Sequence, residues 1–136
     1  MAINYNFWKN KNVFITGHTG FKGSWLSIWL EYMGANVTGY SLKPKSSSCL
    51  FHKSKIENRI KSIYGNILNY KKLSKSIDQA KPEIFFHLAA QPLVSISYKD
   101  PVKTFGTNII GTVNVLEVLK LTKSIKSIII VTSDKV

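Results

Sequence analysis

Cysteine is almost absent from this sequence, with Cys49 the only one among 136 residues. A single cysteine cannot form an internal disulfide, which excludes a small disulfide-stapled secreted domain. Long apolar runs are also missing, since none approaches the roughly 18 residues of a membrane-spanning helix. The N-terminal MAINYNFWKNKN lacks the apolar stretch and small residues of a secretory signal. We therefore expect a soluble protein of a reducing compartment, the cytoplasm.

Arginine and acidic residues are scarce as well. Arg59 is the only arginine among 19 basic residues, and 7 acidic residues leave a formal net charge of +12. Basic proteins bind nucleic acid when their cations displace the counterions of phosphates. Here the lysines are scattered over loops and polar helix faces, without a dense stripe. The pattern favours a solvated, lysine-rich surface that attracts anionic ligands, and nucleic acid is not an expected partner.

Strand-like and helix-like segments alternate along the chain, which we interpret as one domain over residues 1–136. Five apolar runs rich in β-branched and aromatic residues predict strands, at residues 12–16, 36–40, 60–64, 83–88 and 127–132. Helical patterns begin near residue 21 and run over 69–80 and 101–122, the last with Asp100 as cap and Pro101 in its first turn. Residues 43–55 are interpreted as a mobile polar loop. The alternation predicts an α/β fold, a Rossmann-like doubly wound parallel sheet that ends after about its fifth strand.

Three glycines, Gly17, Gly20 and Gly23, follow the first predicted strand and open the first predicted helix. This spacing in this context is typical of a dinucleotide-binding turn. The first glycine permits a tight turn, the second lets the backbone approach a pyrophosphate, and the third lets the helix pack closely. The N–H groups and dipole of the helix that starts near Phe21 then hold the phosphates. The alternative is a glycine-rich turn without a ligand.

The second predicted strand lacks the acidic residue that usually accepts the adenosine ribose hydroxyls in this fold. Ser41 stands at that place, so this rule leaves the choice between NAD and NADP open. Lys43 either favours a 2′-phosphate or is an ordinary loop lysine.

Histidines and tryptophans lie close to these segments. His87 ends an apolar strand, which is more typical of a core histidine than of a proton shuttle. His18, inside the glycine turn, is a weak candidate to face the cofactor. Trp25 and Trp29 are one helical turn apart. We interpret them, together with Trp8, as packing between the N-terminal segment and the first helix.

Five stretches resemble the extended short-chain dehydrogenase/reductase family, and within it the sugar-nucleotide dehydratases. They are NFWKNKNVFITGHTGFKGSWLSIWL, VTGYSLKP, HLAAQPLVSISYKDP, TNIIGTVNVLE and VTSDKV. The resemblance covers essentially the whole chain and implies the N-terminal, cofactor-binding portion of such an enzyme. It implies NAD as cofactor, CDP-glucose as the nucleotide-sugar substrate, no metal, and a full-length homodimer that uses the helix over 101–122.

The resemblance also implies a set of cofactor contacts: Gly17, Thr19, Gly20, Phe21 and Lys22 around the pyrophosphate with Gly23 behind them, Ser41 at the ribose, Asn66 and Ile67 at the adenine, and Leu88, Ala89, Ala90 and Gln91 beside the nicotinamide. Asn66 replaces the aspartate that is usual in the family. It can still form hydrogen bonds, although without a carboxylate's charge. Asn108 is expected to brace the long helix.

Catalytic residues are implied at the end of the fifth strand. Ser133 is expected to hydrogen-bond the sugar hydroxyl that is oxidised, and Asp134 to protonate the departing C6 hydroxyl. Lys135 stands where relatives place the base or its partner. A carboxyl beside a lysine suits loss of water next to a carbonyl, which needs an acid and a base. The implied reaction is dehydration to a 4-keto-6-deoxy sugar, a precursor of deoxysugars for surface polysaccharide.

One motif of the family departs from expectation. The only Tyr-x-x-x-Lys, from Tyr5 to Lys9, precedes the first strand and so lies on the wrong side of the fold for oxidation. We therefore expect the 136 residues alone not to turn over. Two alternatives stay open: another sugar-nucleotide enzyme, namely an epimerase or a GDP- or dTDP-sugar dehydratase, and a noncatalytic nucleotide-binding module.

Overall fold

The computed structural model describes residues 5–44 and 46–132. One sheet holds five strands, β1 (Asn12–Thr16), β2 (Asn36–Ser41), β3 (Lys61–Tyr64), β4 (Ile84–His87) and β5 (Ser127–Ile130). Their order is β3-β2-β1-β4-β5, and every neighbouring pair is parallel. Each of the predicted strands is found. The predicted Rossmann-like parallel sheet is therefore confirmed.

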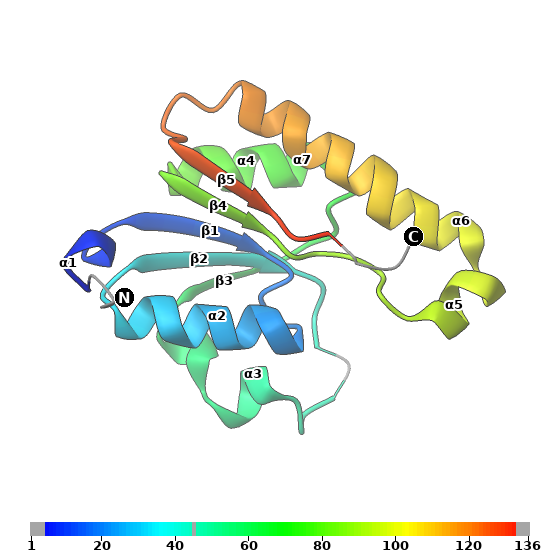
Figure 1. The fold of residues 1–136 in the computed structure, drawn as a ribbon, viewed down its shortest axis with the longest axis horizontal. Coiled ribbons are helices and arrows are strands. Elements are labelled where there is room, and N and C mark those ends of the chain that lie inside the picture. Colours follow the sequence, from blue (N-terminus) through cyan, green and yellow to red (C-terminus); the bar gives the residue numbers. More distant parts are fainter. Residues whose placement is uncertain (1–4, 45, 133–136) are drawn as a thin grey trace.

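Helices cover both faces of the sheet (Figure 1). α2 (Phe21–Tyr32) and the short α3 (Leu50–Lys53) lie on one face, and α4 (Tyr70–Ala80) and α7 (Gly111–Lys120) lie on the other. Phe14 belongs to the core beside α4 and α7, where its ring stacks on Phe85 at 5.3 Å. Val13 and Ile15 belong to the core beside α2. Successive residues of β1 thus serve opposite cores, as in a strand buried on both faces.

The predicted long helix is built from three parts in succession, α6 (Pro101–Phe105), the π-helical turn η2 (Gly106–Ile110) and α7. The predicted cap is present, because the Asp100 side chain accepts a hydrogen bond from the Lys103 N–H at 3.0 Å. The π-turn was not predicted, since a single inserted register step hardly alters the apolar period. Within the described ranges, no helix has both the length and the apolar character needed to cross a bilayer.

Two sequence-based interpretations were wrong. Residues 43–55 are not simply a polar loop, because they contain α3, whose Phe51 is fully buried, and the 3₁₀ helix η1 (Ile56–Asn58) follows. Trp8 packs on the core beside α2 as predicted, but Trp25 and Trp29 are 54% and 50% exposed and do not contribute to that core. The reason is that α2 buries the face that carries its small residues, including Gly23 and Ser27.

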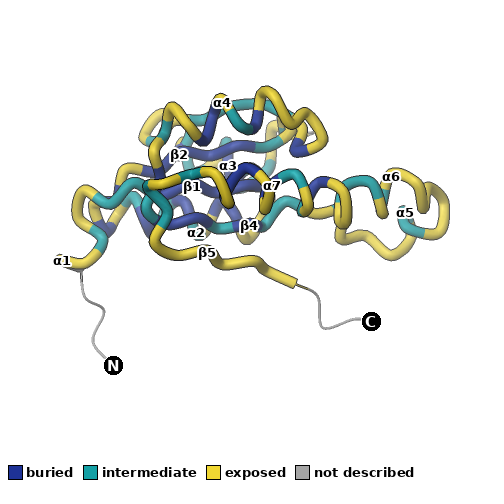
Figure 2. Tube along the Cα trace, turned by 90° about the horizontal axis from the view of Figure 1, so that it is seen from above, coloured by how far each residue is buried: buried dark blue, intermediate teal, exposed yellow. Residues whose placement is uncertain are grey.

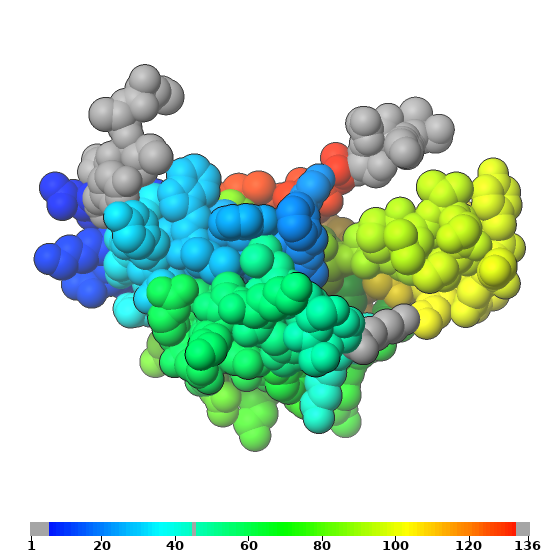
Figure 3. Space-filling view, turned by 90° about the horizontal axis from the view of Figure 1, so that it is seen from below, coloured from blue at the N-terminus to red at the C-terminus, as the bar shows by residue number. Residues whose placement is uncertain are grey.

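A lobe projects from the layered body (Figures 2 and 3). It contains α5 (Val94–Lys99) and α6, neither of which buries a residue. The outer face of α6 and α7 carries an exposed apolar row, Val102, Phe105, Ile109, Val113 and Leu116. The apolar period of this helix therefore describes its outer face, whereas α7 packs on the core through Val115, Val118 and Leu119.

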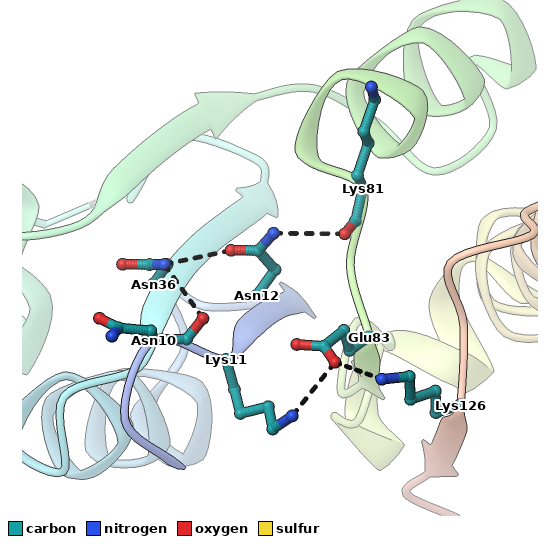
Figure 4. Close-up of polar contacts among 7 residues, drawn as sticks. All are labelled: Asn10, Lys11, Asn12, Asn36, Lys81, Glu83 and Lys126. Atoms are coloured by element: carbon teal, nitrogen blue, oxygen red, sulfur yellow. Dashed lines mark hydrogen bonds and ion pairs between the residues drawn. The ribbon is translucent and has the colours of Figure 1, made fainter.

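Polar contacts tie together the amino ends of the strands, near α1 (Tyr5–Trp8) (Figure 4). Glu83 Oε1 accepts hydrogen bonds from Lys126 Nζ at 2.7 Å and from Lys11 Nζ at 3.2 Å. These hydrogen bonds, that of Lys126 first, lower the pKa of the Glu83 carboxyl. Asn36 Nδ2 donates to Asn12 Oδ1 at 3.2 Å. This cluster clamps β1, β2 and β4 at the edge of the sheet opposite the glycine turn.

Candidate functional site

The candidate site lies where the carboxyl ends of β1, β2 and β4 meet. The glycine turn follows β1, Ser41 ends β2, and the segment from Leu88 follows β4. The chain moves outward from β1 to β2 and β3, and then returns to the other side of β1 at β4. In doubly wound sheets ligands bind at such a reversal, outside the carboxyl ends of the strands.

Two glycines bring the turn into contact with its neighbours. Gly17 has a φ of +79°, and a Cβ on it would lie 2.8 Å from the Ala89 nitrogen and the Leu88 carbonyl carbon. A Cβ on Gly23 would overlap the Gly17 carbonyl oxygen. The first glycine therefore admits the segment after β4, and the third admits the first turn of α2. Two of the predicted cofactor segments, the glycine turn and the residues from Leu88, thus touch each other.

The middle glycine faces an open side. A Cβ on Gly20 would meet only the Gly17 oxygen, at 3.3 Å. Gly20 is the N-cap of the 12-residue helix α2, and it offers no side-chain hydrogen bond to the first N–H groups. Phe21 and Lys22 are exposed beside it. Uncapped N–H groups at the positive end of a helix suit a phosphate, so these residues fit a dinucleotide.

Thr19 and Ser41 join the glycine turn to the end of β2. Thr19 Oγ1 donates to the Leu42 carbonyl oxygen at 3.1 Å and lies 2.8 Å from Ser41 Oγ. A hydroxyl has one hydrogen, so Ser41 donates to Thr19 and its own oxygen remains an acceptor. Ser41 can thus accept a hydrogen bond from a ribose hydroxyl. Lys43 Nζ lies 5.8 Å from the centroid of the Tyr64 ring.

His18 does not face the open side of the turn. Its ring is fully buried, with Nε2 2.6 Å from Ser62 Oγ and its plane edge-to-face with Phe51 at 5.2 Å. Burial lowers the pKa of His18 to about 4, against a smaller opposing effect of the Tyr40 backbone. The residue anchors the glycine turn to β3 and α3.

Of the two residues predicted to contact the adenine, one is exposed and the other is buried. Asn66 is exposed, and its Oδ1 accepts the Leu68 N–H at 3.0 Å, which leaves the amide NH₂ as the group it can offer to a ligand. The side chain of Ile67 is 4% exposed and packs in the core against Gly111. Asn114 Nδ2 donates to the Ile67 carbonyl oxygen at 3.1 Å and holds this segment to α7.

The segment from Leu88 to Gln91 is fixed at both ends. Thr16 Oγ1 accepts from the N–H groups of Leu88 at 3.2 Å and Ala89 at 3.3 Å. At the other end the Gln91 N–H donates to Asn108 Oδ1 at 2.8 Å, and Asn108 Nδ2 donates back to the Gln91 carbonyl oxygen at 3.1 Å. Asn108 therefore joins the long helix to this segment. Ala90 is exposed between the two anchored ends.

The family model for GDP-mannose 4,6 dehydratase matches residues 14–136. The chain belongs to this family. A similar curated protein is the CDP-glucose 4,6-dehydratase of Salmonella typhimurium, which is 50% identical over 133 residues, or 98% of this chain. The match confirms the resemblance to the sugar-nucleotide dehydratases of the extended short-chain dehydrogenase/reductase family.

Solved structures of epimerases share this fold. An epimerase from Methanothermobacter thermautotrophicus superposes with a TM-score of 0.83 and 29% identity over 96% of this chain. The UDP-glucose 4-epimerase of Brucella ovis, solved in complex with NAD, gives 0.75 and 27% over 88%. The chain spans only 37% of the Salmonella dehydratase and 37% and 35% of these two structures.

Three residues that hold the site together were not indicated by the sequence. Thr16, Thr112 and Asn114 make the bonds that hold the site, yet they were assigned no role. The spacing of Asn108 and Thr112, one helical turn apart, was the available signal. Ser133, Asp134 and Lys135 lie outside the described residues. Among the residues that are described, no three His, Cys, Asp or Glu side chains gather as metal ligands.

Proposed function

We propose that this chain forms the NAD-binding part of an enzyme that dehydrates CDP-glucose to CDP-4-keto-6-deoxyglucose. The observation that carries the proposal is the 50% identity to the Salmonella CDP-glucose 4,6-dehydratase across 98% of the chain. The geometry supports it, because an uncapped helix start, an acceptor at Ser41 and an anchored segment after β4 surround one edge of the sheet. The single Cys49 fits a reducing cytoplasm.

NAD suits the residues at this edge. The N–H groups of Phe21 and Lys22, beside the open side of Gly20, would bind the pyrophosphate, and Ser41 would accept a hydrogen bond from a ribose hydroxyl. Asn66 would offer its amide to the adenine, and the segment Leu88–Gln91 would line the nicotinamide. When bound, NAD supplies the acceptor and donor of the hydride that the sugar loses and regains.

The chemical steps are assigned to residues that follow β5. Ser133 would orient the C4 hydroxyl by a hydrogen bond. Once C4 is a ketone, the C5 proton becomes acidic, and Lys135 or a base beside it would remove that proton. Asp134 would protonate the C6 hydroxyl as it departs, so that water leaves across C5 and C6. Positioned acids and bases contribute typically 10² to 10⁴-fold each.

The test is turnover by the complete gene product with CDP-glucose, GDP-mannose and dTDP-glucose, read by mass spectrometry as loss of one water. We expect CDP-glucose to react fastest. Asp134→Asn should lower kcat by about 10² to 10⁴-fold, whereas Asp78→Asn, an exposed position on α4, should leave it unchanged. Faster reaction of another sugar nucleotide, or an isomer of unchanged mass, would overturn the assignment. The 136 residues alone should bind NAD without turnover.

We also propose that the whole protein is a homodimer that buries the outer face of α6 and α7. The exposed row that begins at Val102 and Phe105 supports this proposal, since contiguous apolar patches mark interaction surfaces.

A further inference from the structure

His87 lies at the end of β4, between β1 and α7, and both of its ring nitrogens are engaged. Nδ1 lies 2.6 Å from Thr16 Oγ1, and Nε2 lies 3.0 Å from Thr112 Oγ1. The residue is only 3% exposed. A hydroxyl can donate or accept, so the direction of each bond must be worked out from the other partners of the two threonines.

The partners of Thr16 determine the first direction. Its oxygen already faces the N–H groups of Leu88 at 3.2 Å and Ala89 at 3.3 Å, and an N–H group can only donate. The Leu88 N–H is shared with the Thr16 carbonyl oxygen at 3.1 Å, whereas the Ala89 N–H donates to the hydroxyl oxygen, and neither N–H group can accept the hydrogen of the Thr16 hydroxyl. The Thr16 hydrogen therefore points to His87 Nδ1, which must be an unprotonated acceptor.

The partners of Thr112 determine the second direction independently. Thr112 Oγ1 donates to the Asn108 carbonyl oxygen at 2.7 Å, because a carbonyl can only accept. Its oxygen is then an acceptor, and His87 Nε2 must carry the hydrogen. Both sides of the ring thus demand the same neutral tautomer, with the proton on Nε2.

These hydrogen bonds all donate in the same direction, from the Thr16 hydroxyl to the His87 ring, from the ring to the Thr112 hydroxyl, and from that hydroxyl to the Asn108 carbonyl oxygen. Asn108 lies in the π-turn η2, and its side chain exchanges two hydrogen bonds with Gln91. The segment Leu88–Gln91 is therefore held at its first residues by Thr16 and at its last by Asn108. Within this series of hydrogen bonds, His87 connects Thr16, which holds the first residues of the segment, to Thr112 and Asn108 on the long helix, which hold its last residue.

We propose that His87, as the neutral Nε2–H tautomer, is a positioning residue that holds Leu88–Gln91 against the π-turn in the arrangement that cofactor binding requires. An imidazolium would bring a further N–H to Thr16 Oγ1 and would leave the hydrogen of the Thr16 hydroxyl without the acceptor that Nδ1 provides. Burial, which lowers the pKa of His87 to about 4, acts in the same direction. The reference to the cofactor rests on the proposed function, whereas the tautomer and the anchoring do not.

The first test is an NMR measurement of the ring nitrogens of His87 in the chain without NAD at neutral pH. Long-range couplings between ring nitrogens and carbon-bound protons distinguish the two tautomers. We expect a protonated Nε2 and an unprotonated Nδ1. A proton on Nδ1, or a charged ring, would overturn the inference, and no variant has to fold for this result.

The second test removes the hydrogen bonds of the Thr112 hydroxyl. Thr112→Val keeps the shape of the side chain and removes the hydroxyl. Thr122→Val is the matched control, because Thr122 Oγ1 donates to the Val118 carbonyl oxygen at 2.8 Å in the same way but lies farther along the sequence. We expect amide exchange at Ala89 and Gln91 to accelerate about tenfold in Thr112→Val only, because local opening becomes easier. NAD affinity should fall about threefold to tenfold in the same variant, by loss of preorganisation.

Equal exchange at Gln91 in the two variants would contradict the anchoring role. If the unaltered chain fails to bind NAD, the proposed function is wrong, while the tautomer and the exchange rates still decide whether His87 holds this segment.

Discussion

Gly20 and Gly23 belong to one motif, yet the structure constrains them differently. A methyl group at Gly23 would overlap the Gly17 carbonyl oxygen, whereas one at Gly20 would lie 3.3 Å from that atom and otherwise face open space. Gly23 is therefore needed for packing within the protein. Gly20 is needed for the approach of a ligand.

This difference predicts distinct effects of a single methyl group. Gly23→Ala should lower the free energy of unfolding by about 1 to 3 kcal/mol, because the crowded atoms belong to rigid backbone. Gly20→Ala should leave that free energy nearly unchanged and weaken NAD binding by about tenfold or more. Urea unfolding and calorimetric titration measure both quantities. A Gly20→Ala chain that binds NAD as tightly as the unaltered one would refute the role given to this glycine.

His18 and His87 make stability depend on pH. Burial lowers the pKa of each from 6.5 to about 4, so between these values the unfolded state binds more protons than the folded state. Stability must then fall as pH falls through this window. From pH 7 to pH 5 we expect a loss of about 2 kcal/mol per histidine, which urea midpoints across this range would measure. An unchanged or rising midpoint on acidification would contradict it.

At the scale of elements, the sequence predicted the features that depend on residues close together in the chain. The strands followed from β-branched and aromatic runs, and the start of α6 followed from Asp100 and Pro101. The burial of Phe51 depends on a distant segment, because its ring packs on His18 of the glycine turn, and the π-turn hardly alters the apolar period, so no local pattern revealed either feature. The glycine turn was located from its spacing. The links among Thr16, His87 and Thr112 were not, because only the pairing of β1 with β4 and the packing of α7 bring them together.

The caps of α4 and α6 give a matched comparison between elements. Asn69 caps α4, whose Leu73 and Ile77 are buried, whereas Asp100 caps α6, which buries no residue. Asn69→Ala should lower the global free energy of unfolding by about 1 kcal/mol. Asp100→Ala should instead accelerate amide exchange at Lys103 with little global effect, because an exposed helix opens locally. Equal losses of global stability in the two variants would show that the lobe folds as one unit with the core.

At the scale of the whole molecule, the two layers of helices leave the outer face of α6 and α7 uncovered. This face is apolar although the chain has a formal net charge of +12. Like charges oppose association, so a dimer would have to form through a patch that carries little charge. The row that includes Phe105 is such a patch.

A charge placed in this row should prevent self-association of the whole protein. Phe105→Glu should shift the complete gene product from dimer to monomer in sedimentation velocity, because burying an unpaired carboxylate is unfavourable. Trp29→Glu is the control, since Trp29 is exposed to a similar degree but lies on α2, on the opposite face of the sheet. A dimer that survives Phe105→Glu would exclude this face as the interface.

The central claim, that the edge formed by β1, β2 and β4 binds NAD, is tested most directly by titrating the isotope-labelled chain with NAD and following its amide NMR signals. We expect saturable changes at Gly20–Gly23 and at Ala89–Gln91, with little change at Asn36 and Glu83, which lie at the opposite edge. The absence of saturable changes, or changes centred on the opposite edge, would contradict the claim.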